Sequence, residues 1–250
     1  MFVPRRQNVH TLPLNCTEIT RLIRPAALTL IALSLVACGS NIEDAKIALK
    51  ESIVIKTDLS VDDLRSYPGG VVCGAFTAYI SYHDPRKENA PFIYRDEKID
   101  RDPQPRDWKV FCSEDPAASL AAIAGFGPIT RESAEWLKII ADFASIESAL
   151  EDYYEENHSY PQTEQGLAAL KEKPESRMRM PNYREGGYLN PIPTDPWGRP
   201  YVYKSTQWGR TKGTVEMISL GRDGEPGGEG LDADVSSELQ RYLVHIDRIL

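Results

Sequence analysis

The chain has 250 residues, of which 41% are hydrophobic and 26% are charged, and its formal net charge at pH 7 is −8. These fractions are close to those of folded domains, which excludes a disordered chain and a chain that lies mostly inside a membrane. The negative charge, without a stripe of Lys and Arg interleaved with aromatic residues, argues against nucleic acid as a partner.

The first predicted element is an export signal. Arg21 and Arg24 precede an apolar run over 26–37 (AALTLIALSLVA). This run has about the length of the apolar core of a signal peptide, whereas a helix that crosses a membrane needs roughly 20 residues. We therefore expect residues 1–37 to be a signal peptide. Because this segment is long for such a signal, a translation start downstream of Met1 is an alternative.

Residues 35–39 (LVACG) resemble the lipobox of bacterial lipoproteins, in which the cysteine is acylated and becomes the first mature residue. The resemblance implies a lipid on Cys38, and therefore a periplasm-facing lipoprotein of the cell envelope that is anchored in a lipid membrane. Gly39 resembles the pattern for sorting to the outer membrane, and the inner membrane is the alternative. An ordinary cleaved signal with a cysteine at this position by chance is the competing interpretation.

The remaining cysteines fit an exported chain. If Cys16 is removed with the signal and Cys38 carries lipid, only Cys73 and Cys112 are left. An even pair in an oxidising compartment predicts a disulfide between them, with two reduced buried thiols as the alternative. In the chain-entropy model such a bridge stabilises the fold by about 3–4 kcal/mol. No further Cys or clustered His completes a zinc site.

Residues 38–115 are predicted to form a small α+β module tied by this disulfide. Apolar residues at helical spacing predict a helix over 42–56, and segments rich in β-branched and aromatic residues predict strands over 71–80, 91–94 and 108–112. The sequences at 72–74 (VCG) and 91–94 (PFIY), together with Cys112, resemble a small family of periplasmic and lipoprotein modules. That resemblance supports the boundary of the module and implies no activity.

The rest of the chain, 116–250, is predicted to form a second domain. Residues 116–128 are predicted to form a connector, with a partly helical segment as the alternative, and a helix is predicted to follow from a cap at Thr130 to Asn157. Its apolar residues recur every three or four positions, which predicts packing on the domain's own sheet, with a partner-binding surface as the alternative: Trp136, Ile140, Phe143, Ile146, Leu150 and Tyr153. A short helix capped by Thr163 and paired strands at 201–203 and 215–218 complete the expected elements.

The loop over 219–235 has the composition of a cation site. Asp223, Asp232 and Asp234 offer carboxylates, and five glycines between 221 and 230 let the backbone turn sharply. Calcium fits better than magnesium because it accepts six to eight oxygen ligands in loose geometry. The spacing is not that of an EF-hand. A solvated acidic turn is the alternative interpretation.

Several motifs in this half resemble the major pseudopilin, protein G of type II secretion, over about 134–237. They follow one another in the order of that family: IESAL (146–150), YP (160–161), TEQGL (163–167), DPWG (195–198) and SLGRDGEPGGEGLDAD (219–234). The resemblance implies an α+β fold, with a long helix packed on a small antiparallel sheet and a calcium-binding C-terminal loop. The implied calcium ligands are the side chains of Asp223, Asp232 and Asp234 and the carbonyl group of Leu220.

The chain departs from that family before its long helix. Pseudopilins begin with a peptidase cleavage site and a long apolar helix that builds the pilus core, whereas residues 136–157 are amphipathic and charged. We therefore expect the lipid, rather than such a helix, to hold the domain at a membrane, and we do not expect it to pack into a pilus in the usual way.

The expected function is non-catalytic. His83, His158 and His245 have no sequence neighbours that suggest a nucleophile and base, and no GxSxG, HExxH or phosphate-loop motif is present. The prediction is a lipoprotein component of, or accessory to, protein secretion, with pseudopilins or other secretion proteins as partners. The alternative is a stand-alone lipoprotein that binds a ligand or surface and is unrelated to secretion.

Overall fold

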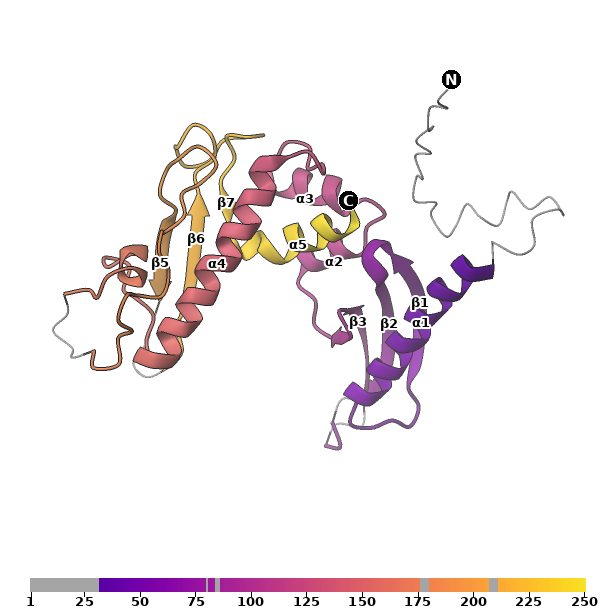
Figure 1. Ribbon diagram of the computed structural model, residues 1–250. Coiled ribbons are helices and arrows are strands. Elements are labelled where there is room, and N and C mark those ends of the chain that lie inside the picture. Colours follow the sequence, from indigo (N-terminus) through magenta and orange to yellow (C-terminus); the bar gives the residue numbers. More distant parts are fainter. Residues whose placement is uncertain (1–31, 80, 84–85, 176–179, 207–210) are drawn as a thin grey trace, which may run out of the picture. The chain divides into compact units, whose positions relative to one another are not determined.

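The computed structural model describes residues 32–250 except 80, 84–85, 176–179 and 207–210 (Figure 1). The chain divides into two compact units, and the first ends at Pro103 and the second begins at Gln104. The sequence analysis predicted this boundary after residue 115. Most of the predicted signal peptide, 1–31, and the side chain of Cys38 lie outside what is described. Within the described part of the chain, no helix combines the length and the apolar character that crossing a membrane requires.

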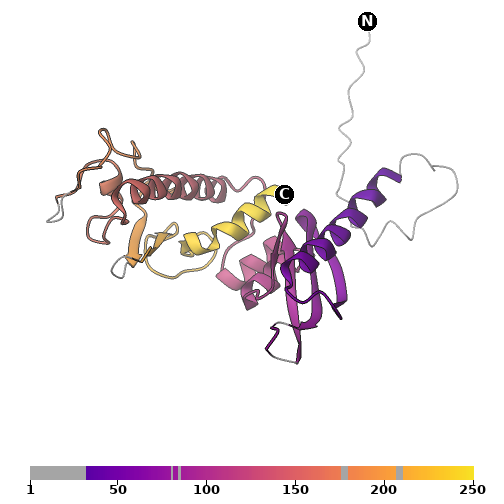
Figure 2. The same ribbon diagram turned by 90° about the horizontal axis from the view of Figure 1, so that it is seen from below.

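The first unit is a four-stranded antiparallel sheet with a helix on one face (Figures 1 and 2). The strands lie in chain order, and a 3-10 turn, η2 (Pro68–Gly70), joins the first two. The elements are α1 (Ala32–Ser52), β1 (Ser60–Tyr67), β2 (Val71–Tyr79), β3 (Lys87–Arg95) and β4 (Lys98–Asp100). Alternate residues of β2 and β3 face the helix, which is the period of two that a half-covered strand requires.

The core of this unit lies between α1 and the sheet. Leu49 of α1 is fully buried with Phe76 of β2 and Phe92 of β3, whose ring centroids are 6.3 Å apart. Gly74 lies on the same face, where an added Cβ would come within 3.1 Å of the Phe92 ring and 3.0 Å of the Leu64 side chain. A larger residue at this position would therefore need these side chains to move by a few tenths of an ångström, which favours glycine.

The sequence predicted most of the first unit correctly. The predicted helix over 42–56 overlaps the second half of α1, which ends at Ser52. The strands over 71–80 and 91–94 correspond to β2 and β3, and residue 80 lies outside the described residues. Two strands were not predicted. β1 contains acidic residues and a register shift between Asp62 and Arg65, with Asp63 at φ 53°, so its alternation is broken, and β4 has only three residues.

The predicted strand over 108–112 is wrong, because residues 108–111 belong to helix α2 (Pro105–Phe111), in the second unit, and Cys112 caps this helix. Pro105 occupies the first turn, and Gln104 and Asp107 form a reciprocal capping box. These start signals outweigh the strand propensity of the apolar residues that follow. Cys112 ends this helix, and Cys73 lies in β2. Both are disulfide-bonded, and their pairing with each other stays a prediction.

The second unit combines helices with a three-stranded antiparallel sheet in the order β5-β6-β7. Figures 1 and 2 show the longest helix, α4, running along the sheet. The elements that follow α2 are α3 (Pro116–Ala124), α4 (Ala134–Asn157), η3 (Leu167–Leu170), β5 (Val202–Thr206), β6 (Thr214–Ser219), β7 (Val235–Ser236), η4 (Ser237–Leu239) and α5 (Gln240–Ile249). The predicted α+β fold with a long helix on a small antiparallel sheet is confirmed.

Helix α4 carries the core of this unit on one stripe. Trp136, Phe143, Ile146, Leu150 and Tyr153 are buried as predicted, and the Phe143 ring lies 5.2 Å from that of Tyr201 beside the sheet. The fully buried residue near the start is Ile139, whereas Ile140, which the sequence analysis assigned to the stripe, is half-buried.

Both predicted helix caps are wrong. Residues 130–133 form a hydrogen-bonded turn, in which the Ser133 N–H donates to the Thr130 carbonyl group at 3.1 Å, and the helix begins after Ser133. Thr163 does not cap the short helix η3. Its hydroxyl group accepts from the Ser205 N–H at 3.0 Å and donates to the Ser205 carbonyl group at 3.2 Å. This hydroxyl therefore satisfies backbone groups at the edge of β5.

We expect Phe143→Ala to lower the free energy of unfolding of the second unit by about 3–5 kcal/mol, because it leaves a cavity beneath α4. The control is Leu137→Ala, on the same helix, where the side chain is 40% exposed. That change is expected to stay within about 0.5 kcal/mol. Urea unfolding followed by circular dichroism measures both. Equal losses for the two variants would contradict the assignment of the stripe to the core.

Candidate functional site

The candidate site is the glycine-rich loop between β6 and β7, which closes on itself through backbone hydrogen bonds. The Arg222 N–H donates to the Leu231 carbonyl group at 2.8 Å, and the Gly224 N–H donates to the Leu220 carbonyl group at 3.1 Å. Gly221 has φ 63°, and a Cβ there would clash with the carbonyl oxygen of Asp232. The two arms of the loop are therefore in backbone contact.

The structure separates the roles of the three predicted carboxylates. Asp223 is exposed, and its Oδ1 accepts from the Glu225 N–H at 3.1 Å. Asp232 binds the Arg222 guanidinium through two hydrogen bonds of 2.9 and 3.0 Å. Asp234 accepts from the Gly227 N–H through Oδ2 at 3.0 Å. Its other oxygen, Oδ1, is buried and has no hydrogen-bond partner.

A buried carboxylate oxygen without a donor is costly in the absence of a cation or water, so the position of Asp234 Oδ1 fits a metal ligand. Asp232 fits less well, because Arg222 already neutralises it. Among the residues that the structure describes, no group of three His, Cys, Asp or Glu side chains is arranged to hold a metal ion. Backbone carbonyl groups, such as that of Leu220, would have to supply further oxygens.

A turn at 195–199 supports the start of this loop. The sequence analysis did not assign a role to its two main residues, Asp195 and Arg199. Asp195 is 2% exposed and accepts from the N–H groups of Trp197 at 3.0 Å and Arg199 at 2.8 Å. The Arg199 guanidinium donates to the carbonyl group of Gly221, and its Nε lies 3.6 Å from Asp195. An aspartate two residues before a backbone N–H that it can bind is a local signal that could have identified Asp195.

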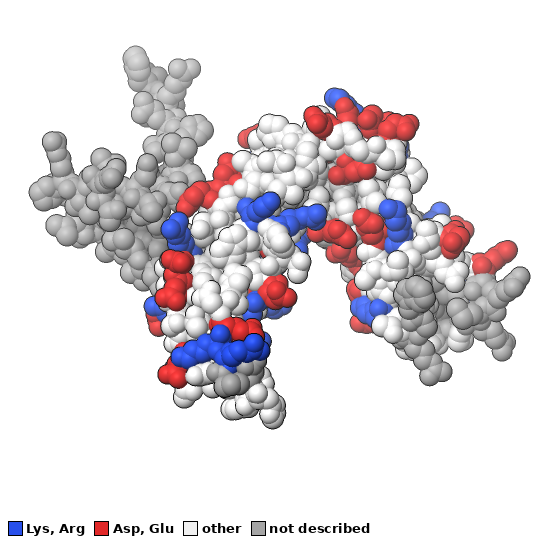
Figure 3. Space-filling model, turned by 180° about the vertical axis from the view of Figure 1, so that it is seen from behind, with Lys and Arg blue, Asp and Glu red and all other residues white. Residues whose placement is uncertain are grey.

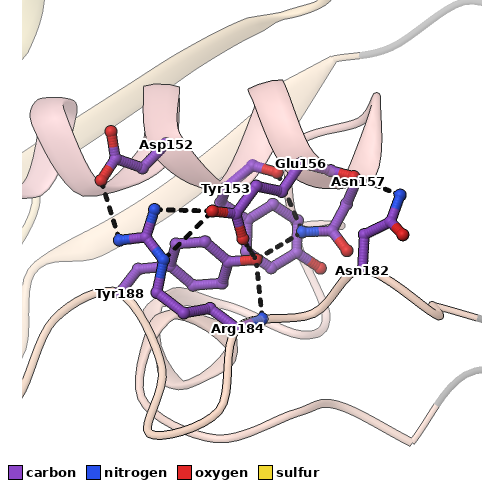
Figure 4. Close-up of polar contacts among 7 residues, drawn as sticks. All are labelled: Asp152, Tyr153, Glu156, Asn157, Asn182, Arg184 and Tyr188. Atoms are coloured by element: carbon purple, nitrogen blue, oxygen red, sulfur yellow. Dashed lines mark hydrogen bonds and ion pairs between the residues drawn. The ribbon is translucent and has the colours of Figure 1, made fainter.

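A second polar cluster fastens the loop at 181–190 to the end of α4 (Figure 4). Arg184 donates to Glu156 at 2.7 and 3.1 Å and to Asp152 at 3.0 Å. The Tyr188 hydroxyl group donates to Glu156 at 2.9 Å and accepts from Asn157 at 2.7 Å. Hydrogen bonds from Arg184 are the main reason that the pKa of Glu156 lies below its ordinary value. The carboxylates at the end of α4 therefore bind the loop at 181–190 of the same unit.

A third cluster links α4 to the segment before β6. The Lys212 ammonium group lies 2.6 Å from Glu151 and 4.9 Å from the centre of the Tyr154 ring. The Tyr160 hydroxyl group donates to Glu151 at 2.5 Å. Burial, followed by this hydrogen bond, raises the pKa of Tyr160 to about 12. Lys212 and Tyr160 thus satisfy another carboxylate of α4 within the domain.

Acidic side chains gather at the top of the face shown in Figure 3, at the end of the unit where the glycine-rich loop lies. Elsewhere on this face Lys and Arg are interspersed with Asp and Glu. Two histidines of the second unit lie on helices outside the loop: His245 is buried in α5, with its ring 5.2 Å from that of Phe111, and His158 ends α4 at φ 57°.

Comparisons with known proteins agree with this architecture. The family model described as type II secretion system protein G matches residues 130–238. The type II secretion system core protein G of Vibrio cholerae is 44% identical over 107 residues, which cover 43% of this chain and 70% of that protein. The Pseudomonas aeruginosa protein of the same name is 43% identical over 96 residues, which cover 38% of this chain and 66% of that protein.

Among solved structures, the major pseudopilin from the type 2 secretion system of enterohaemorrhagic Escherichia coli is similar at 36% identity. The similarity covers 43% of this chain and 89% of that chain, with a TM-score of 0.36. The chain spans about two thirds of the length of its curated relatives.

A long amphipathic helix on a small antiparallel sheet, with a closed glycine-rich loop between the last two strands, defines a pseudopilin-like domain. The chain belongs to the type II secretion system protein G family, through residues 130–238. The resemblance found in the sequence over 134–237 is therefore confirmed. The first unit and the helices α2, α3 and α5 lie outside the matched segment.

We expect the contribution of Glu156 to stability to depend on pH. Because its pKa in the folded chain is lowered, chiefly by Arg184, the charged form stabilises the fold above the unfolded value of about 4.3, and this contribution is lost as the pH falls through the folded value. Glu156→Gln should therefore lower the urea midpoint at pH 7, and the difference from the native chain should shrink at about pH 3.

The control is Glu155→Gln, which removes the same charge from the preceding position of α4, where the side chain is exposed. It should change the midpoint less than Glu156→Gln at pH 7. A Glu156→Gln deficit that is the same at both pH values would contradict the role of the ionised carboxylate.

Proposed function

We propose that this chain is a membrane-anchored, non-catalytic component of, or accessory to, type II secretion, in which a lipid on Cys38 holds the protein G-like domain at an envelope membrane. The observation that carries the proposal is the match of residues 130–238 to the protein G family, together with relatives that are named core proteins of that secretion system. Pseudopilins and other proteins of the same system are the proposed partners.

The anchor rests on the sequence at 26–38, where an apolar run ends in a lipobox-like cysteine. A lipid would attach the domain to the membrane surface, and the sorting pattern at Gly39 favours the outer membrane. The envelope is also where a partner of secretion proteins would have to act. The proposed absence of catalysis is supported by Glu151, Glu156 and Asp232, whose carboxylates already bind lysine, arginine or tyrosine of the second unit.

One observation favours a second candidate. The matched segment covers less than half of the chain, and the whole first unit lies outside it. A stand-alone envelope lipoprotein that binds a ligand or surface, and that uses the protein G-like domain only as a stable scaffold, would have the same architecture. The two candidates differ in their partners: the first contacts pseudopilins in the envelope, and the second does not.

Affinity purification after cross-linking in cells separates the two candidates. We expect the tagged chain to be recovered from the membrane fraction with pseudopilins attached. Cys38→Ser should move it to the soluble periplasmic fraction, because the acylated residue is lost, whereas the control Cys16→Ser should leave it with the membrane. Membrane recovery of Cys38→Ser would disprove the lipid anchor. A membrane-bound chain that captures no pseudopilin would favour the stand-alone lipoprotein.

Calcium binding by the glycine-rich loop is the second part of the proposal. The buried oxygen of Asp234 without a partner supports it, and Asp223 and the carbonyl group of Leu220 are the further proposed ligands. Asp232 would join them only by releasing Arg222, which binds it in the structure described here. When bound, the ion would neutralise the carboxylates and hold the two arms of the loop together.

Calcium that binds only the folded chain should raise the free energy of unfolding by about 2.7 kcal/mol at a hundredfold excess over its dissociation constant. Thermal unfolding with calcium and with a chelator measures this shift. Asp234→Asn should abolish the shift, and the control Glu225→Gln, at an exposed position of the same loop, should retain it. If the native chain shows no shift at millimolar calcium, the loop is not a calcium site.

A further inference from the structure

Residues 125–127, the bracing segment, run along the glycine-rich loop. The segment begins at Gly125, which has φ 73° and caps the end of α3. The Gly230 N–H of the loop donates to the Gly125 carbonyl group at 2.7 Å, and Phe126 forms a parallel bridge with Gly230. Because the family model matches only residues 130–238, the bracing segment is an element that this chain adds to the family domain.

The bracing segment and the loop approach each other closely over several residues. A Cβ atom added to Gly127 would lie 3.6 Å from the Cα atom of Gly230, and one added to Gly125 would lie 3.8 Å from the carbonyl oxygen of Gly228. Both are ordinary van der Waals distances. Residues 228–230 of the loop therefore lie directly against the bracing segment.

The side chain of Phe126 holds the bracing segment to the core of the second unit. Phe126 is buried, and the centroid of its ring lies 4.7 Å from that of Trp136, in the first turn of α4. Trp136 is itself buried as part of the apolar stripe of α4. A tilted aromatic pair at this distance adds to the stabilisation that burial alone supplies. Phe126 thus contacts the loop through its backbone and α4 through its side chain.

The helices outside the family segment support the start of the bracing segment. The Gly125 N–H donates to the Ala121 carbonyl group of α3, and α3 contacts both α2 and α5. The Tyr242 hydroxyl group of α5 donates to the buried Asp107 of α2 at 2.7 Å, which fastens these two helices together. The bracing segment is therefore anchored through α3 as well as through Phe126.

The part of the loop that the bracing segment contacts adjoins the proposed calcium ligand. Gly227 and Asp234 share two hydrogen bonds: the Gly227 N–H donates to Oδ2 at 3.0 Å, and the Asp234 N–H donates to the Gly227 carbonyl group at 3.1 Å. The other oxygen of Asp234, Oδ1, is buried without a partner. Because Gly227 directly precedes residues 228–230, a shift of those residues would move Gly227 and, with it, the Asp234 carboxylate.

We propose that Phe126 is a positioning residue of the glycine-rich loop, which ties residues 228–230 to α4 and so keeps the Asp234 carboxylate in the position from which it binds calcium. The calcium part rests on the proposed function of the loop. The apparent affinity of a site falls with the fraction of molecules that hold the binding-competent conformation. The bracing segment, which lies outside the family segment, therefore sets the calcium affinity of this chain.

Calorimetric titration with calcium tests this role in chains that carry Cys38→Ser, so that no lipid is attached. We expect Phe126→Ala to raise the dissociation constant about tenfold, as for a loop that is competent about a tenth of the time. The matched control is Leu150→Ala, which also removes a fully buried apolar side chain, at a position about 20 Å further along α4 than Trp136. It should leave the dissociation constant unchanged.

A purely structural role would lower the stability of both variants and leave calcium binding by the folded chain unaltered. Equal dissociation constants for the native chain and Phe126→Ala would therefore overturn the proposal.

Hydrogen exchange of the Gly230 amide, measured by NMR without calcium, tests the contact separately. We expect this amide, which donates to Gly125, to exchange about tenfold faster in Phe126→Ala than in Leu150→Ala, because the local opening that exposes it becomes easier. A native chain that binds no calcium would disprove the calcium site, and the exchange rates would still decide whether Phe126 holds the loop. Equal rates in the two variants would show that it does not.

If circular dichroism shows that Phe126→Ala is unfolded, Phe126→Leu takes its place in both measurements. Leucine keeps an apolar side chain against Trp136 but loses the contact between the rings. We expect changes in the same direction and of smaller size. A folded Phe126→Leu chain with native calcium affinity and native exchange at Gly230 would overturn the proposal.

Discussion

Burial of one apolar stripe of α4 is the constraint on which the second unit depends. Phe143 and Ile146 are fully buried, and the stripe continues to Tyr153. Because the helix is amphipathic, its opposite face carries carboxylates, and these bind the chain that returns around it: Asp142 accepts from Tyr201, and Glu156 accepts from Arg184. The apolar stripe therefore positions the sheet, and the polar face positions the loops.

Backbone hydrogen bonds and the side chains of Arg199 and Arg222 hold the glycine-rich loop closed. Arg199 links the buried Asp195 to the carbonyl group of Gly221, and Arg222 neutralises Asp232. The buried oxygen of Asp234, which has no hydrogen-bond partner, is the group that a cation would satisfy.

The chain sets a protein G-like domain among elements that lie outside the family segment. The first unit has its own core between α1 and its sheet, and α2, α3 and α5 add a helical cluster to the family domain. Domain architecture of this kind explains why the family match covers less than half of the chain. It also means that function is best argued from the particular surfaces of this chain, since fold alone is shared among proteins with different roles.

Local signals in the sequence determined the long helix, the paired strands β5 and β6 and the family motifs, because hydrophobic period and glycine and proline positions act within a few residues. Local signals could not determine that residues 108–111 form part of a helix and not a strand, that Thr163 binds Ser205, or that Arg222 neutralises Asp232. The link between Asp107 and Tyr242 joins residues 135 positions apart. Only the tertiary structure decided such pairs, because each depends on packing that brings distant segments together and not on the residues beside it.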